Sequence, residues 1–256
     1  YAAIATLLGL PEQNAQDQNE TVSAVKRWLA ANSGWLLILD NADDLKLVRE
    51  FLPVSHNGHV LLTTRAQNFG DLAVRNTVHK MTAAEGALFL LHKIGKLPNG
   101  EPLDSAPLEL RLQAETLSNE LDGLPLALDQ AAAFIVEMPS SLEQYLRLYA
   151  TERAELLAHR GELTQDHPSV TVTFSLAFKQ VEQSSAAAAD LLRVCAFLES
   201  DAIPMEIFSD GGQKLGDAMS AIADSPFKLT KAIAEAGRFS LLQVDPDENT
   251  VSLHRL

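Results

Sequence analysis

Two short polar segments, each directly after an apolar run, carry the residues of this sequence that could bind a metal ion and a phosphate. Asp40 ends the first run, and Thr63, Thr64 and Arg65 end the second. A carboxylate is a ligand that Mg²⁺ prefers, and an arginine binds phosphate through charge-assisted hydrogen bonds. The spacing therefore indicates a site in which an anion and its metal ion are held together, provided that the fold brings the two segments close.

The two apolar runs have the composition of neighbouring strands in a parallel sheet. Residues 35–39 are apolar at every position, which suits a strand covered on both faces, whereas a strand with one wet face would alternate. Residues 60–62 form the second run. In a strand, helix, strand unit both strands point the same way, so Asp40 and Arg65 would emerge at the same sheet edge, where open α/β sheets bind ligands.

The segment between the two runs predicts the crossover helix of this unit. Asp43 or Asp44 could cap its start by accepting hydrogen bonds from free backbone N–H groups, and Pro53 would follow its end. Three apolar residues recur at helical spacing and would face the sheet: Leu45, Val48 and Leu52.

Composition limits the function classes. The chain has 256 residues, of which 46% are hydrophobic, so it can bury at least one substantial core. Its formal net charge of −14 argues against a broad nucleic-acid or anionic-membrane surface, because such surfaces need clustered Lys and Arg. No segment is long and apolar enough to span a bilayer. Any anion site must therefore be local.

The single cysteine, Cys195, lies within an apolar helical run, where we expect it to be a small buried core residue. One cysteine allows no internal disulfide, which favours a reducing compartment, and we expect the cytoplasm. The chain opens at Tyr1, without Met and already inside an apolar helix-like pattern, which indicates a piece of a longer polypeptide.

The phosphate-cradling pattern G-x-x-x-x-G-K-[ST] does not occur in these residues. Its closest imitation is 211–215, Gly-Gly-Gln-Lys-Leu, in which Lys214 follows Gln and no Ser or Thr comes after it. This stretch does not follow a buried strand. We interpret it as a loop that leads into a helix.

Five motifs together give the chain a family resemblance. Residues 35–40 resemble a Walker B strand and 61–65 the sensor strand of the NB-ARC domains, which belong to the signal-transduction ATPases called STAND proteins. The strongest motif is Gly-Leu-Pro-Leu-Ala-Leu at 123–128, which matches the family's GLPLAL signature. Residues 81–89 resemble the opening of the first helical subdomain. Leu-His-Arg at 253–255 falls where the family carries Met-His-Asp.

The resemblance implies an α/β plus all-α chain with three parts. Residues 1–80 would be the C-terminal part of a parallel-sheet P-loop NTPase domain. Residues 81–160 would be a helical bundle, the ARC1-like subdomain. Residues 161–256 would be a winged-helix, ARC2-like subdomain. The residues themselves agree with this order, because helical spacing prevails after Lys80, and the last part alternates as a hairpin around residues 245–249.

In residues 1–80, the resemblance implies that Asp40 holds Mg²⁺ and that Thr64 and Arg65 contact the nucleotide, with Arg65 at the γ-phosphate. On the residues alone, an Asp at a strand end often caps the next turn instead. Arg65 could equally form a solvated ion pair with a nearby carboxylate. The implied cofactor is ADP or ATP with Mg²⁺.

Further along the chain, the resemblance implies that Gly123, Leu124 and Pro125 bind the nucleotide, with Pro125 near the base or ribose. A proline beside a glycine also suits a helix start after a tight turn, so both roles can hold together. His254 resembles the family histidine that contacts the β-phosphate of ADP and clamps the winged helix onto the nucleotide domain. Without the resemblance, a histidine after an alternating strand is more often structural.

Two departures from the family pattern bear on catalysis. Many members follow the metal-binding Asp with a second acidic residue, but here that position is Asn41, which cannot act as a base. Arg255 replaces the Asp of Met-His-Asp. We expect hydrolysis to be slow or absent: at most a slow ATPase in a longer parent protein, and no activity in this chain alone.

The main functional hypothesis is a nucleotide-dependent switch in which ADP bridges the subdomains in a closed state and exchange for ATP loosens them. Its expected partners are the nucleotide, an N-terminal effector and P-loop segment, and C-terminal sensor repeats. An alternative is a non-hydrolysing scaffold or interaction module that has lost the nucleotide. A winged-helix DNA-binding regulator is a third alternative, which the acidic residues Asp245, Asp247 and Glu248 of the predicted wing disfavour.

Overall fold

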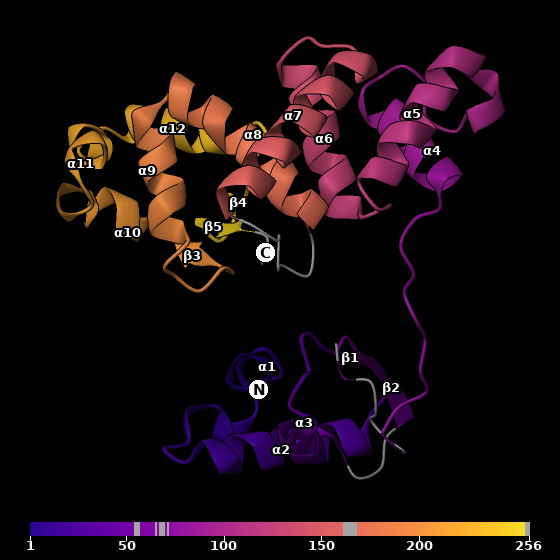
Figure 1. Cartoon of the computed structure of the whole chain (residues 1–256). Coiled ribbons are helices and arrows are strands. Elements are labelled where there is room, and N and C mark those ends of the chain that lie inside the picture. The colour runs from indigo at the N-terminus through magenta and orange to yellow at the C-terminus, as the bar shows by residue number, and fades with distance from the viewer. Residues whose placement is uncertain (54–56, 65, 67–69, 71, 161–167, 254–256) are drawn as a thin grey trace. The chain divides into compact units, whose positions relative to one another are not determined.

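The structure of the chain is a computed structural model (Figure 1). It describes all residues except 54–56, 65, 67–69, 71, 161–167 and 254–256, and only the backbone of 157–160. The described chain divides into two compact units, Tyr1–Val78 and His79–Leu256, which are called unit 1 and unit 2 below.

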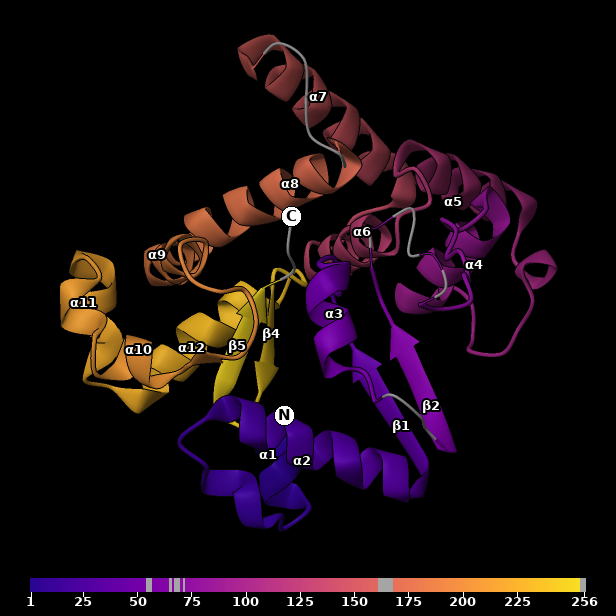
Figure 2. The same cartoon turned by 90° about the horizontal axis from the view of Figure 1, so that it is seen from below.

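Unit 1 contains the predicted strand, helix, strand element. Strands β1 (Ser33–Leu39) and β2 (Asn57–Leu62) pair in parallel, with Leu37 opposite Val60 and Leu39 opposite Leu62, and they lie side by side in Figure 2. The helices of the unit are α1 (Ala2–Leu7), α2 (Gln18–Ala31) and α3 (Leu45–Phe51), and a short 3₁₀ helix spans Pro11–Asn14.

Helix α3 is the predicted crossover helix, and Asp44 rather than Asp43 caps it. The Asp44 Oδ1 atom accepts hydrogen bonds from the backbone N–H groups of Lys46 and Leu47, at 3.0 and 3.2 Å. These are two of the donors that a helix start leaves without an intrahelical partner. The helix ends at Phe51. The next residue, Leu52, has an extended conformation, which a residue before a proline such as Pro53 prefers.

The prediction that the first strand is covered on both faces is wrong for unit 1. Leu37 is buried against the apolar core formed with Val25 and Leu29 of α2, but its neighbours Leu36 and Ile38 are 60% and 55% exposed. Successive side chains of a strand point to opposite faces. Helix α2 packs on the Leu37 face of the sheet, and among the described residues of unit 1 the Leu36 and Ile38 side chains on the other face stay largely exposed.

The first half of unit 2 is helical. Its helices are α4 (Ala83–Lys93), α5 (Leu108–Glu120), α6 (Pro125–Glu137) and α7 (Leu142–Arg160), with a 3₁₀ helix at Leu103–Ser105. The start of α4 carries a capping box: the Thr82 hydroxyl accepts from the Glu85 N–H, and the Glu85 carboxylate accepts from the Thr82 N–H.

The second half adds the helices α8 (Pro168–Ser184), α9 (Ala186–Cys195), α10 (Glu206–Ser209), α11 (Asp217–Ala223) and α12 (Pro226–Gly237), with a 3₁₀ helix at Gly212–Lys214. A small antiparallel sheet has the order β3 (Ile203–Pro204), β5 (Thr250–Leu253), β4 (Leu242–Asp245), and α12 packs against β4. The predicted hairpin around residues 245–249 is confirmed. No helix of the described residues combines the length and the apolarity that crossing a bilayer requires.

One apolar core runs through unit 2, from α4 to β5. The rings of Phe134 in α6 and Phe239 after α12 lie 5.8 Å apart, centroid to centroid, so the core joins elements on both sides of residue 160. The predicted boundary between 160 and 161 adjoins residues outside the described part of the chain, and the division of unit 2 into two subdomains stays a prediction. Cys195 is 2% exposed within this core, as predicted.

Candidate functional site

The carboxyl ends of β1 and β2 bring polar residues together. Because Leu39 pairs with Leu62, the next residues, Asp40 and Thr63, lie opposite each other. The Thr63 hydroxyl donates a hydrogen bond to Asp40 Oδ1 and accepts one from the backbone N–H of Asn41 at 2.9 Å. The backbone N–H of Thr63 donates to the Leu39 carbonyl at 3.0 Å, so the ladder continues to the end of the strands.

A second hydroxyl and carboxylate pair lies one residue further on. The Thr64 hydroxyl donates to Asp43 Oδ1 at 3.1 Å and accepts from the backbone N–H of Ala66 at 3.0 Å. Asn41 adopts a left-handed conformation, with φ of +51°, between Asp40 and Asp43. Two threonines of the β2 end thus hold two carboxylates of the β1 end, and we call these four residues, Asp40, Asp43, Thr63 and Thr64, the strand-end cluster.

The oxygen atoms of the strand-end cluster are suitable ligands for a magnesium ion that also keeps water and phosphate ligands. Asp40 is exposed, and it offers a carboxylate beside the hydroxyl of Thr63. Mg²⁺ is commonly bound through one or two carboxylates together with substrate phosphates and several waters. Within the described residues no group of three or more His, Cys, Asp or Glu side chains is placed to hold a metal ion by itself. A metal ion held at Asp40 would therefore need further ligands from outside these carboxylates.

Sequence reasoning assigned a role in the site to Asp40 and Thr64 but none to Thr63 or Asp43. The missed signal is the strand register: once the two runs are aligned as a parallel pair, Thr63 is the residue opposite Asp40. Arg65, the predicted phosphate ligand, lies outside the described residues. Its placement beside the cluster stays a prediction.

Gly123, in the Gly-Leu-Pro-Leu-Ala-Leu motif, makes a close backbone contact with Met81. Its φ is +60°, and a Cβ atom there would lie 2.1 Å from the Met81 carbonyl oxygen. The Met81 N–H donates to the Gly123 carbonyl at 2.9 Å, and the Gly123 N–H donates to the Ser118 carbonyl at 2.9 Å. Lys80, the residue before Met81, forms an ion pair with Asp122, the residue before Gly123. Only glycine fits this turn without strain.

The rest of the motif starts helix α6. Leu124 is the N-cap residue and Pro125 the first helical residue, where its missing N–H leaves no partner unsatisfied. Ala127 and Leu128 are fully buried in the core of unit 2. Gly123, Leu124 and Pro125 thus belong to unit 2, whereas the strand-end cluster belongs to unit 1.

The last predicted site residue, His254, lies outside the described residues, as does Arg255. Strand β5 is described up to Leu253, whose backbone N–H donates to the Ser200 carbonyl at 2.8 Å. The hairpin that precedes it is acidic. Asp245 Oδ1 accepts hydrogen bonds from the N–H groups of Asp247 and Glu248, at 3.0 and 3.1 Å, and all three side chains are exposed.

Part of the chain matches a known protein family. Residues 179–256, from within α8 to the end, match the family described as a domain of unknown function, DUF7779. This stretch contains the β3-β5-β4 sheet and the helices around it. The match covers less than half of the chain.

The chain is also similar to a protein from Hyaloscypha variabilis that is named nucleotide-binding leucine-rich repeat (NLR)-like protein. The two sequences are 24% identical over 272 aligned residues. The similarity covers 94% of this chain but 25% of the relative, so the chain spans about a quarter of that protein's length. The similarity to this relative therefore extends over nearly the whole chain, which contains both the strand-end cluster and the start of α6.

Proposed function

We propose that this chain is part of a nucleotide-dependent signalling switch of the NB-ARC type. ADP bridges its parts in a closed state, and exchange for ATP loosens that bridge. The observation that carries the proposal is the strand-end cluster, in which Asp40 and Asp43 meet Thr63 and Thr64 at the carboxyl ends of two parallel strands. Open α/β sheets bind ligands at this edge. The NLR-like name of the relative from Hyaloscypha variabilis supports the same class.

Each residue has a defined task in this proposal. Asp40 holds Mg²⁺, and the Thr63 hydroxyl fixes the orientation of its carboxylate by donating to Oδ1. The metal ion supplies positive charge that offsets the phosphate oxygens. Arg65 and His254 contact the γ- and β-phosphates.

In this proposal no side chain of the cluster acts as a general base. Asn41 occupies the position after Asp40, and an amide cannot take a proton from water. Asp43 already accepts the Thr64 hydroxyl through Oδ1. The proposed switch therefore works by binding and exchange, and hydrolysis is slow or absent.

Binding energy sets how far a nucleotide can move such a switch. A ligand shifts an equilibrium between two arrangements only by the difference in its affinities for them. Couplings of about 1 to 3 kcal/mol are typical. In this scheme His254 contacts ADP in the closed state alone, so it contributes to that difference, whereas Asp40 contributes to binding in both states.

A non-hydrolysing scaffold is the second candidate function, and the contact between Gly123 and Met81 favours it. That contact, with the helix start at Pro125, accounts for the Gly-Leu-Pro part of the motif by packing alone. A chain that has lost the nucleotide would keep these residues for the fold. The two candidates differ in one measurable property, the affinity for ADP.

The test is calorimetric titration with ADP and ATP, with and without Mg²⁺. It uses this chain and a longer chain that adds an upstream phosphate-binding loop. The proposal expects ADP binding in the longer chain that strengthens with Mg²⁺. It expects the magnesium effect to disappear in Asp40→Asn and to persist in Glu109→Gln, a matched loss of one exposed carboxylate in α5. Binding in neither chain would favour the scaffold.

A further inference from the structure

An open groove of about 580 Å³ in unit 2 is lined by α6, the turn that follows it, α7 and Gln180 near the end of α8. Phe134 forms part of its apolar lining and is 3% exposed. Met138 and Leu148 also line it, and they remain 40% and 44% exposed. Large apolar side chains that stay in contact with water beside a groove indicate a surface that another molecule covers.

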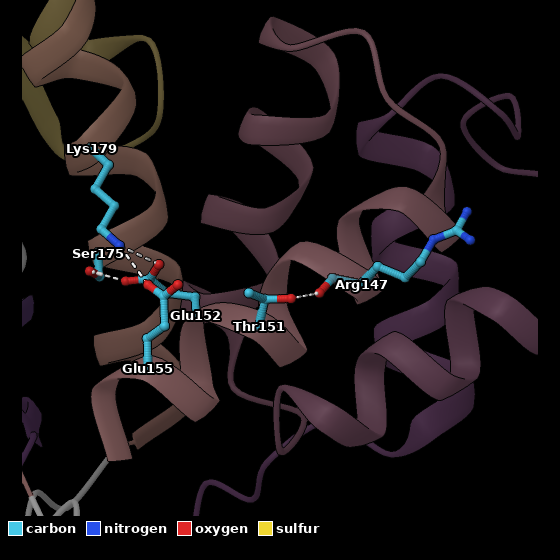
Figure 3. Close-up of polar contacts among 6 residues, drawn as sticks. All are labelled: Arg147, Thr151, Glu152, Glu155, Ser175 and Lys179. Carbon is cyan, nitrogen blue, oxygen red and sulfur yellow. Dashed lines mark hydrogen bonds and ion pairs between the residues drawn. The ribbon is translucent and has the colours of Figure 1, made fainter. Parts of the chain in front are cut away.

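Helix α7, which forms one wall of the groove, is hydrogen-bonded to α8. Glu152 of α7 is 4% exposed and accepts hydrogen bonds from the Ser175 hydroxyl and the Lys179 ammonium of α8, each at 2.6 Å (Figure 3). Thr151, the residue before it, lines the groove. A buried, hydrogen-bonded carboxylate fixes the spacing of the two helices, so the groove is a preformed feature of the fold.

The charge of the groove comes from Arg147. It is the charged residue among the described lining residues, in a chain whose net charge is −14. Figure 3 shows its side chain extending away from the Glu152 and Lys179 pair. Its own ion pair, with Glu143 at 3.3 Å, joins two exposed side chains, and such pairs contribute little. The groove is therefore complementary to an acidic group.

Polar side chains also line the groove. The Ser140 hydroxyl, at the end of the groove formed by the turn after α6, is buried and has no hydrogen-bond partner among the described residues. A buried hydroxyl without a partner is unfavourable. Its burial keeps this hydroxyl out of a ligand's reach, whereas Gln180 of α8, which also lines the groove, offers a side-chain amide.

We propose that this groove binds an amphipathic peptide segment of a partner protein. Apolar side chains of the peptide insert between Met138 and Leu148 above Phe134, and an Asp or Glu of the peptide pairs with Arg147. Small-molecule sites bury about 70–90% of their ligand. Because Met138 and Leu148 lie open to solvent, the groove favours a longer occupant that spans it and continues along the helices.

The test begins with a selection from a displayed library of random peptides on the full chain, without nucleotide. The proposal expects enriched peptides that combine two or more large apolar residues with Asp or Glu. A labelled peptide from this selection is then titrated against variants. Leu148→Glu should weaken binding by about tenfold or more, and Arg147→Gln by a smaller factor.

Matched controls separate the groove from general effects. Leu112→Glu adds the same charge at an exposed leucine of α5, and Lys96→Gln removes an exposed positive charge after α4. Both should leave affinity unchanged. Circular dichroism verifies that every variant folds, which is expected because Leu148 and Arg147 are exposed.

Three results would overturn the proposal: no enriched peptide, enriched peptides that are basic, or binding that Leu148→Glu leaves intact. Self-association of the chain that Leu148→Glu abolishes would instead assign the groove to a second copy. The experiment contains no nucleotide, so its outcome is separate from that of the proposed switch.

Discussion

The backbones of Met81 and Gly123 meet at the start of unit 2, where the Met81 N–H donates to the Gly123 carbonyl at 2.9 Å. The contact joins the entry of α4 to the turn between α5 and α6. Its closeness explains why a glycine occupies position 123, since a Cβ atom would overlap the Met81 carbonyl oxygen. A motif that resembles a nucleotide-binding signature therefore has a second task in the fold.

Gly123→Ala should destabilise unit 2 by about 2 kcal/mol or more, because it adds strain at a positive φ to a backbone overlap. Gly95 has a similar φ of +68° with nothing within 4 Å of a built Cβ. Gly95→Ala should therefore show the conformational cost alone, about 1 kcal/mol. Urea unfolding of both variants measures the difference, and equal losses would contradict the role of Met81.

Removing the α3 cap should weaken unit 1. Asp44→Ala leaves the N–H groups of Lys46 and Leu47 without their partner and should cost about 1 kcal/mol, whereas Asp44→Asn should cost much less. Hydrogen exchange of the α3 amides reports this locally. If exchange in α3 were as slow in Asp44→Ala as in the unchanged chain, Asp44 would not be the cap.

The contacts of Glu152 should make the alkaline stability of unit 2 depend on Lys179. Its hydrogen bond with Glu152 raises the pKa of Lys179 above the ordinary 10.5. A raised pKa in the folded state contributes stability at pH values below the ordinary pKa, and this contribution disappears as pH rises through the folded value.

Glu152→Gln removes the charge that raises this pKa and keeps an acceptor for Ser175. Stability measured by urea unfolding between pH 10 and pH 12 should therefore fall less steeply in the variant than in the unchanged chain. The Lys179 side chain is 48% exposed, so solvent screens its interaction with Glu152 and the difference between the two slopes should be small. Identical slopes would show that the pair does not couple to folding.

Cys195 should be unreactive in the folded chain. Burial raises the pKa of its thiol to about 12, so the thiolate, which is the reactive form, is scarce at pH 8. A disulfide reagent such as 5,5′-dithiobis(2-nitrobenzoate) should label it slowly under native conditions and fast in urea. Rapid labelling of the folded chain would show that the core around α9 opens.

The order of the strands and helices could be predicted from the sequence because its signals are local. The apolar runs, the carboxylates before Leu45 and the proline at 53 marked β1, α3 and β2 within a few residues. The exposure of Leu36 and Ile38 could not be predicted, since an unbroken apolar run does not tell how many layers cover it within its own unit.

The candidate site was predicted in part for the same reason. Asp40 and Thr64 follow apolar runs, which a reader of the sequence can see, whereas Thr63 required the strand register. The groove could not be predicted at all. Its residues come from three helices and the turn between α6 and α7. On α7 they lie beside a second, buried set, Tyr145, Tyr149 and Glu152, so no single apolar stripe marks the groove.

The open sheet of unit 1 has a practical consequence for handling the protein. A sheet of two strands is marginal by itself, and β1 and β2 have no further strand partner among the described residues. Unpaired edges next to exposed leucine and isoleucine side chains template the pairing of one molecule with another. Residues 79–256, produced separately, should stay monodisperse at concentrations where residues 1–78 precipitate, and light scattering of the two fragments would show it.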